Sequence, residues 1–153
     1  MKEQYKELKE DILDEEKAID ETIERLREIR GKFDPRKQDN LTEPAMGTYL
    51  MNFYNGIENI LKRVSKEYYL IMPKGNSWHK ELIVLSYDAP EGKIPIFDQG
   101  LAERIIPYKN FRHRFISGYG FQLKGEKMLE LIDNVGPLWD DMKKAISEFF
   151  NKL

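Results

Sequence analysis

The segment YKNFRHRFISGYGFQL, residues 108–123, joins a dense basic cluster to regularly spaced aromatic residues. In a helix, the four-residue spacing of Phe111, Phe115 and Tyr119 places their side chains on one face. Glycines on either side of Tyr119 weaken such a helix by about 1 kcal/mol each relative to alanine. The segment is therefore either an amphipathic core helix with a solvated basic face or a helix end that binds an anion. The basic residues are Lys109, Arg112, His113 and Arg114.

Three blocks of sequence together resemble the HepT-like ribonuclease toxins, which belong to the all-helical HEPN superfamily. The blocks are YLMNFYNGIENIL (residues 49–61), SWHKEL (residues 77–82) and FRHRFISGYGFQL (residues 111–123), in the order expected for that family. The resemblance implies one HEPN/HepT-like domain over residues 1–153 and a homodimer with an RNA-binding cleft at its interface. In that family an arginine and a histidine cleave RNA without a metal ion.

The family motif is Arg, four residues, His, one residue and Tyr. Arg112 and Tyr119 match it, but Ser117 stands at the His position. By resemblance, Arg112 holds the phosphate, and Tyr119 is a candidate site for AMP attachment by a minimal nucleotidyltransferase antitoxin. Ser117 has no group that titrates near neutral pH, so the resemblance implies attenuated cleavage. The RNA-binding candidates are Lys109, Arg112, His113 and Arg114.

The two histidines and Glu58 need separate interpretations. His113 follows Arg112 directly, but a rotation of about 100° per helical residue turns it away from the face of Arg112. Glu58 lies at the edge of an apolar helix face, where we expect a structural role, bonded to backbone or to an arginine, because buried charges need partners. We expect His79, next to Trp78 at a helix start, to pack or to cap rather than to act in catalysis.

Composition limits the possible functions. The 153 residues suit one domain, and the formal net charge of −2 means that any binding of nucleic acid must come from a local patch. The absence of cysteine excludes disulfides and thiolate chemistry, and the spacing of the two histidines does not suggest a zinc site. We therefore expect no metal and no cofactor. Without a signal-like or membrane-spanning segment, we expect a cytoplasmic protein.

Hydrophobic periodicity predicts an all-α, up-and-down bundle of about five helices, three of them long. The first three cover about residues 2–32, 43–71 and 78–87, with Thr42 as a cap of the second and Asn76 or Ser77 as a cap of the third. A fourth helix starts near Asp98, and Pro107 is expected to kink or split it. The last covers residues 125–153, with a kink at Gly136-Pro137.

Two functional hypotheses follow, from different classes. The first is the ribonuclease toxin of a toxin–antitoxin pair, active or attenuated. The second is a non-catalytic HEPN dimer that binds RNA, a nucleotide or a protein partner, and the replacement of the motif His favours it. A generic helical scaffold is the third and least specific alternative.

Overall fold

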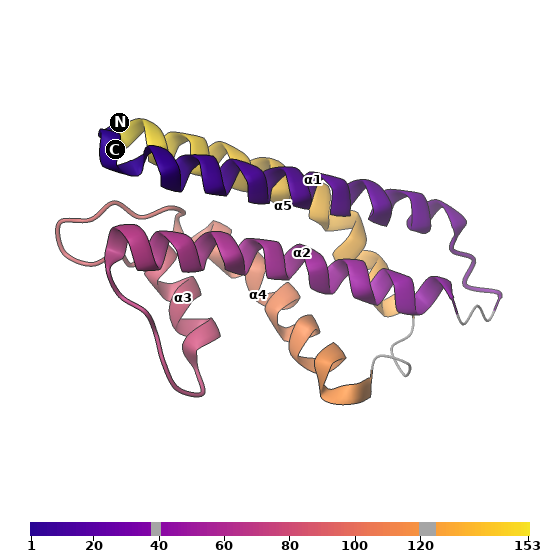
Figure 1. Cartoon of the computed structure of the whole chain (residues 1–153). Coiled ribbons are helices and arrows are strands. Elements are labelled where there is room, and N and C mark those ends of the chain that lie inside the picture. Colours follow the sequence, from indigo (N-terminus) through magenta and orange to yellow (C-terminus); the bar gives the residue numbers. More distant parts are fainter. Residues whose placement is uncertain (38–40, 120–124) are drawn as a thin grey trace.

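The computed structural model describes residues 1–37, 41–119 and 125–153, which form an all-α bundle (Figure 1). Its α-helices are α1 (Lys6–Lys32), α2 (Thr42–Val64), α3 (Trp78–Tyr87), α4 (Gln99–Arg114) and α5 (Gly125–Lys152). A 3₁₀ turn, η1 (Glu3–Tyr5), precedes α1, and the π-helical turns η2 (Ser65–Tyr69) and η3 (Phe115–Tyr119) extend α2 and α4. No strand occurs within the described ranges, so the predicted fold class is confirmed.

The two ends of the chain lie together because α1 and α5 run side by side along one edge of the bundle (Figure 1). The amide of Lys2 donates to the carbonyl of Leu153 at 3.2 Å. Helix α2 lies beneath this pair, with α3 and α4 on its other side (Figure 1). Helix α2 is thus the central element, and it contacts all four of the other helices.

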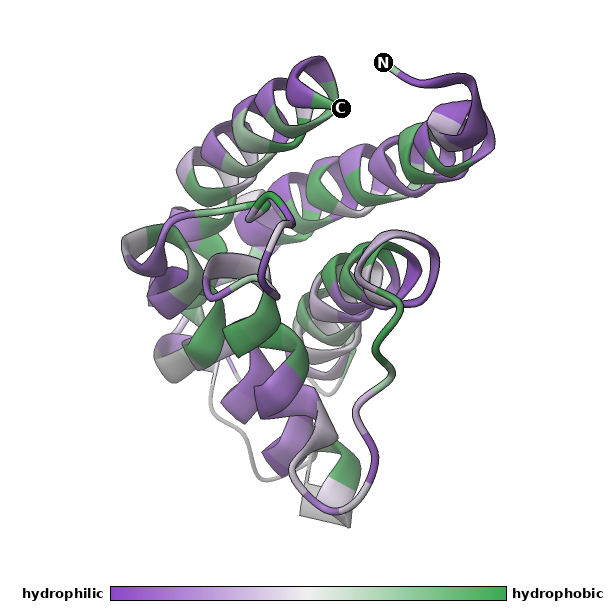
Figure 2. Ribbon diagram, turned by 90° about the vertical axis from the view of Figure 1, so that its left-hand side faces the viewer, coloured by the Kyte–Doolittle hydropathy of each residue, from purple (hydrophilic) through white to green (hydrophobic). Residues whose placement is uncertain are grey.

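One hydrophobic core joins all five helices. In α1 the apolar residues spaced three, four or seven apart are all at most 4% exposed; they are Leu8, Ile12, Ile19, Ile23 and Leu26. Figure 2 shows the same pattern as hydrophobic stretches that face the interior of the bundle. Burial of a side chain of this size contributes roughly 1.5–3 kcal/mol relative to exposure, so packing rather than helix propensity holds these segments.

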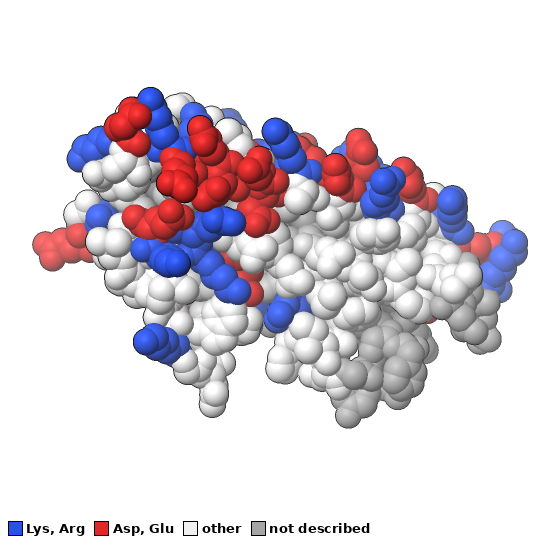
Figure 3. Space-filling view, viewed as in Figure 1, with Lys and Arg blue, Asp and Glu red and all other residues white. Residues whose placement is uncertain are grey.

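Charged side chains are distributed unevenly over the surface. In the view of Figure 3, acidic and basic side chains intermingle over α1 and α5, whereas the part over α2, α3 and α4 is mostly uncharged. No helix in the described part of the chain is both long and apolar enough to cross a membrane.

Two helix ends differ from the sequence-based prediction. Thr42 is the first residue of α2 rather than its cap, and Leu41 occupies the N-cap position. At the other end α2 passes into η2, and Leu70 then adopts a left-handed backbone conformation with a φ of 60°. The helix therefore ends before Pro73, because the left-handed residue has already turned the chain. The third helix begins at Trp78, as expected, with Ser77 at the N-cap position.

Two helices contain a proline, and neither is split by it. Helix α4 continues through Pro107, so of the two predicted outcomes, a kink or a split, the split does not occur. The buried side chains of Ile105, Tyr108 and Phe111 surround Pro107 in the sequence and hold both halves against the core. Helix α5 contains Pro137, and its ribbon bends along its length in Figure 1, as expected for a proline that removes one helical hydrogen bond.

A glycine permits the close contact between α1 and α2. A Cβ atom added to Gly56 would lie 2.5 Å from Cγ1 and 2.8 Å from Cδ1 of Ile19. Ile19 is 1% exposed, so its side chain has little room to move away. Any larger residue at position 56 therefore pushes the two helices apart.

We predict that Gly56→Ala destabilises the protein by up to about 2 kcal/mol. Overpacking costs about 1–3 kcal/mol, and the higher helix propensity of alanine offsets about 1 kcal/mol of this cost. Urea denaturation measures the change. Gly31→Ala is the matched control, since a Cβ at Gly31 meets no atom within 4 Å. A Gly56→Ala variant as stable as the Gly31→Ala variant would show that the two helices do not need this close approach.

Candidate functional site

A pocket of about 330 Å³ lies between the start of α3 and the C-terminal half of α4. Three of its lining residues carry permanent positive charge, two are histidines, and none is acidic. This composition makes the pocket a local basic patch on a chain whose formal net charge is −2. The lining residues are Asn76, Ser77, His79, Lys80, Lys109, Asn110, Arg112 and His113.

Packing of α4 against its neighbours determines the position of Arg112. Tyr108 and Phe111 are each 3% exposed, and the Tyr108 hydroxyl donates to the carbonyl of Leu131 on α5 at 2.6 Å. Burial also raises the pKa of the Tyr108 phenol well above its usual range, so this hydroxyl remains a donor at neutral pH. Arg112 follows Phe111 and is half-buried at the edge of the same contact.

A neutral side chain anchors the Arg112 guanidinium. The Nε atom of Arg112 donates to Oδ1 of Asn55 on α2 at 2.5 Å. A guanidinium has five N–H donors, so the four on the two terminal nitrogens are left for an anion. Arg30 and Arg104 differ, because they pair with Asp133 and Asp141. Among the described residues Arg112 has no carboxylate partner in an ion pair, so its charge is not neutralised.

Phe115 holds the segment that follows Arg112 against α2. Its ring stacks on Phe111, with centroids 5.8 Å apart. The same ring occupies the space above Gly47, where an added Cβ would lie 2.5 Å from it. Gly47 therefore allows η3 to lie directly on α2, and the aromatic face predicted from the spacing of Phe111 and Phe115 is confirmed.

One helical turn beyond Asn55, α2 carries a buried carboxylate. Glu58 is 3% exposed, and its Oε2 accepts a hydrogen bond from the Tyr54 hydroxyl at 2.9 Å. The Lys62 ammonium lies 3.6 Å from Oε1. The structural role expected for Glu58 thus involves partners other than the backbone or an arginine. Burial, and then the nearby Glu58 charge, raise the pKa of Tyr54 far above its usual range, so its phenol stays protonated.

The third partner of Glu58 is His79, whose Nδ1 lies 2.5 Å from Oε2. The imidazole stacks on the Trp78 ring, with centroids 3.5 Å apart, and the Lys62 ammonium lies 4.7 Å from the centroid of that ring. The His79 side chain is 29% exposed and lines the pocket. Since Nδ1 faces the buried carboxylate, Nε2 is the nitrogen that remains for the pocket.

The structure brings some of the predicted site residues together. Lys109, Arg112 and His113 line one pocket, whereas Arg114 is exposed and does not line it. The Ser117 hydroxyl is exposed and donates to the carbonyl of His113 at 2.8 Å. The side chain of Tyr119 lies outside the described residues, so its role as an AMP acceptor stays a prediction.

Sequence reasoning gave no role to Asn55, and it predicted structural roles for Glu58 and His79 without their contact with each other. Their signal is weak, because the contacts join residues 21 and 57 positions apart. The position beside the apolar face that singled out Glu58 could also have pointed to Asn55, which lies three residues before it.

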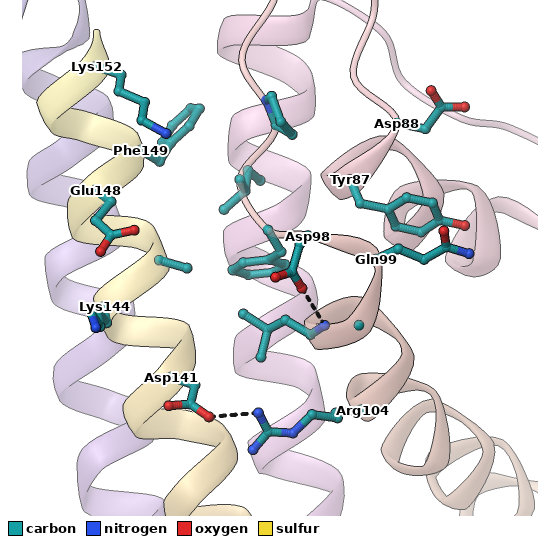
Figure 4. Close-up of a pocket in the computed structure, with 16 residues that line it drawn as sticks. Tyr87, Asp88, Asp98, Gln99, Arg104, Asp141, Lys144, Glu148, Phe149 and Lys152 are labelled. Atoms are coloured by element: carbon teal, nitrogen blue, oxygen red, sulfur yellow. Dashed lines mark hydrogen bonds and ion pairs between the residues drawn. The ribbon is translucent and has the colours of Figure 1, made fainter.

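A second hollow, with a volume of about 1240 Å³, lies at the other end of α4 (Figure 4). There Arg104 on α4 and Asp141 on α5 face each other and pair at 2.6 Å. Asp98 caps α4 by accepting from the amide of Leu101 at 2.7 Å. Charges of both signs line this hollow, so it lacks the uniform positive character of the pocket at Arg112.

Comparisons with known proteins agree with the three sequence blocks. The family model described as HepT-like protein matches residues 45–153, which include most of α2, all of α3, α4 and α5, and every residue of the pocket. Neither a curated protein nor a solved structure matches the sequence significantly. Because the match covers more than two thirds of the 153 residues, the chain belongs to the HepT-like family.

Proposed function

We propose that this HepT-like protein cleaves RNA without a metal ion, at a rate limited by the replacement of the motif His with Ser117. The observation that carries the proposal is the Arg112 guanidinium, held by the neutral Asn55 in a pocket without an acidic lining residue. A phosphodiester carries one negative charge and planar pairs of oxygen acceptors, which match the fork of an arginine.

The role of the guanidinium is to stabilise the charge that develops on the phosphate. Attack of a 2′-hydroxyl on the adjacent phosphorus adds negative charge to the phosphate oxygens in the transition state. Donors that are already fixed in place stabilise this charge without reorganising. The hydrogen bond to Asn55 fixes Arg112 in this way, and Lys80 and Lys109 add positive charge around the pocket.

The environment of Ser117 supports slow cleavage. Its hydroxyl bonds to the carbonyl of His113 on its own helix rather than to a pocket residue. In an α-helix, two residues five apart differ by about 140° in direction. The wider π-helical turn of η3 reduces this angular difference between Arg112 and position 117. A histidine at position 117 would therefore point closer to the direction of Arg112 than it would in a regular α-helix.

Ser117 also favours the second candidate function, a non-catalytic HEPN dimer that binds RNA, a nucleotide or a protein partner. Binding needs the cationic pocket but no group that transfers a proton. A toxin–antitoxin pair with a minimal nucleotidyltransferase, and AMP attachment at Tyr119, extend the proposal to a partner. Growth arrest on expression, relieved by a nucleotidyltransferase encoded nearby, would support that extension.

We predict that the purified protein cleaves total RNA slowly in the presence of EDTA, and that Arg112→Ala reduces the rate by about 10²-fold or more, as for loss of one transition-state donor. Arg25→Ala is the matched control, because Arg25 is exposed on α1 and pairs only weakly with Glu28 at 3.4 Å. Cleavage that is unaffected by Arg112→Ala would contradict the assignment. RNA binding without cleavage would instead select the non-catalytic function.

We predict that Ser117→His raises the cleavage rate, by up to about 10²–10⁴-fold, the usual contribution of a general acid or base. Ser117→Gln is the control, because it adds a side chain of similar length that cannot titrate. Both rates are measured on one fluorescent RNA oligonucleotide. Equal rates for the two variants would show that position 117 does not face the reacting phosphate.

We predict a homodimer with the segment after Arg112 at or near its interface. The resemblance to the family motivates this prediction, and Ile116, which is 54% exposed on η3, lies in that segment. Light scattering after size exclusion should show a dimer at tens of micromolar, and Ile116→Asp should shift it to monomer. Leu13→Asp, at a position that is 44% exposed on α1, is the control and should leave the dimer intact. A wild-type monomer at these concentrations would exclude a cleft shared by two copies.

A further inference from the structure

We infer that His79, held by the buried Glu58, is the group that transfers the proton at the Arg112 site and takes over the role of the missing motif His. The inference rests on the proposed function and adds a second residue of the chemistry to it. Three observations carry it: the hydrogen-bonding partners of the imidazole, its position relative to Arg112, and the identity of the remaining histidine.

Glu58 determines the tautomer of His79. An ionised carboxylate only accepts hydrogen bonds, so the Nδ1 atom of His79, 2.5 Å from Oε2, carries a hydrogen. Two neighbouring donors favour the ionised form of Glu58: the Tyr54 hydroxyl donates to Oε2, and the Lys62 ammonium lies beside Oε1. Nε2 then bears the lone pair. A carboxylate on one nitrogen and a free lone pair on the other is the arrangement that catalytic histidines use.

Helix α2 places the imidazole beside the guanidinium. Asn55 and Glu58 are three residues apart on this helix, so their Cβ atoms are about 5–6 Å from each other. Asn55 holds Arg112 and Glu58 holds His79, each through a contact of 2.5 Å. Both held side chains line the same pocket of about 330 Å³. A phosphate bound to Arg112 in this pocket lies within reach of the imidazole.

The proposed step conserves atoms and charge. Nε2 of His79 takes the proton of the ribose 2′-hydroxyl, and the 2′-oxygen forms a bond to the adjacent phosphorus. The bond from phosphorus to the 5′-oxygen breaks, and the 5′-oxygen takes a proton from water. The products are a 2′,3′-cyclic phosphate and a 5′-hydroxyl, and His79 returns its proton to solvent. Arg112 binds the phosphate oxygens throughout, and Glu58 keeps the imidazole oriented while it is charged.

His113 is the competing candidate, because the chain has two histidines and both line the pocket. His113 is exposed on the last turn of α4, and among the described residues it has no carboxylate partner. Its backbone carbonyl accepts from Ser117, but nothing in the described residues fixes its ring. His79 is the histidine with a defined tautomer, and for this reason we assign the proton transfer to it.

The test compares three variants on one RNA dinucleotide in EDTA: His79→Gln, His113→Gln and Glu58→Gln. His79→Gln should lower kcat by about 10²–10⁴-fold. Added imidazole should restore part of the rate to His79→Ala, which a structural role of His79 would not allow. Arg25→Ala is the control with unchanged rate.

Glu58 acts as a positioning residue, and its variant needs its own readout. The amide of Glu58→Gln can donate to Nδ1 and so favours the other tautomer of His79. We expect kcat to fall at least about 10-fold with little change in KM. Circular dichroism of each variant establishes that it is folded.

A second measurement keeps His79, Glu58 and Arg112 unchanged, so it does not depend on the stability of the His79 and Glu58 variants. His113→Gln leaves His79 as the one imidazole in the chain. In its NMR spectrum the ring nitrogens should show the tautomer with hydrogen on Nδ1, and a 2′-deoxy substrate analogue should shift them. The opposite tautomer, or signals that do not respond to the analogue, would overturn the assignment of His79.

The outcomes separate this inference from the proposed function. Cleavage that depends on Arg112 but persists in His79→Gln would leave the proposed function intact and overturn the role of His79. Loss of cleavage in His113→Gln, with His79→Gln active, would assign the proton transfer to His113 instead. A wild-type protein without cleavage that depends on Arg112 would overturn both proposals.

Discussion

The buried carboxylate of Glu58 is the constraint on which the geometry of the site depends. A carboxylate that is 3% exposed costs several kcal/mol of folding free energy unless it is paired. Tyr54 and Lys62 supply partners from its own helix, one turn before and one turn after it. His79 is the partner from another element. The need to satisfy Glu58 therefore ties the start of α3 to α2. A helix of ten residues such as α3 has little stability of its own, so this tie determines where its first turn lies.

The neutral Asn55 complements the charged Glu58 on the same helix. If a carboxylate held Arg112, the pair would be neutral and would attract a phosphate only weakly. The amide oxygen of Asn55 accepts one hydrogen bond and leaves the guanidinium charge in the pocket. The arginines that do pair with carboxylates, such as Arg30 and Arg104, are on the exposed surface, where such pairs contribute at most about 1 kcal/mol. Helix α2 thus carries a compensated negative charge and, one turn away, the neutral Asn55 that holds the uncompensated positive charge of Arg112 on α4.

The fold could be predicted from the sequence to the extent that it depends on local periodicity. The spacing of Leu8, Ile12 and Ile19 predicts a buried stripe, and all three are buried. The sequence left open whether Pro107 kinks or splits its helix, because a rule about one lost hydrogen bond does not include the core contacts that hold both halves of α4. Arg112 was identified through a motif of contiguous residues. His79 was not, because its role arises from a contact with Glu58 that depends on the packing of α3 against α2.

The arrangement also explains why a serine in the motif need not abolish the chemistry of the site. In the family motif the arginine and the histidine lie five positions apart on one segment, so the turn of a single helix sets their geometry. In the site inferred here, the two groups belong to α4 and α3, and each is anchored to α2. Their separation then depends on how closely three helices pack. Gly47 is a part of that packing, because it lets the Phe115 ring and the segment after Arg112 rest on α2. A residue without a side chain thus helps to hold the segment after Arg112 against the helix that anchors both groups.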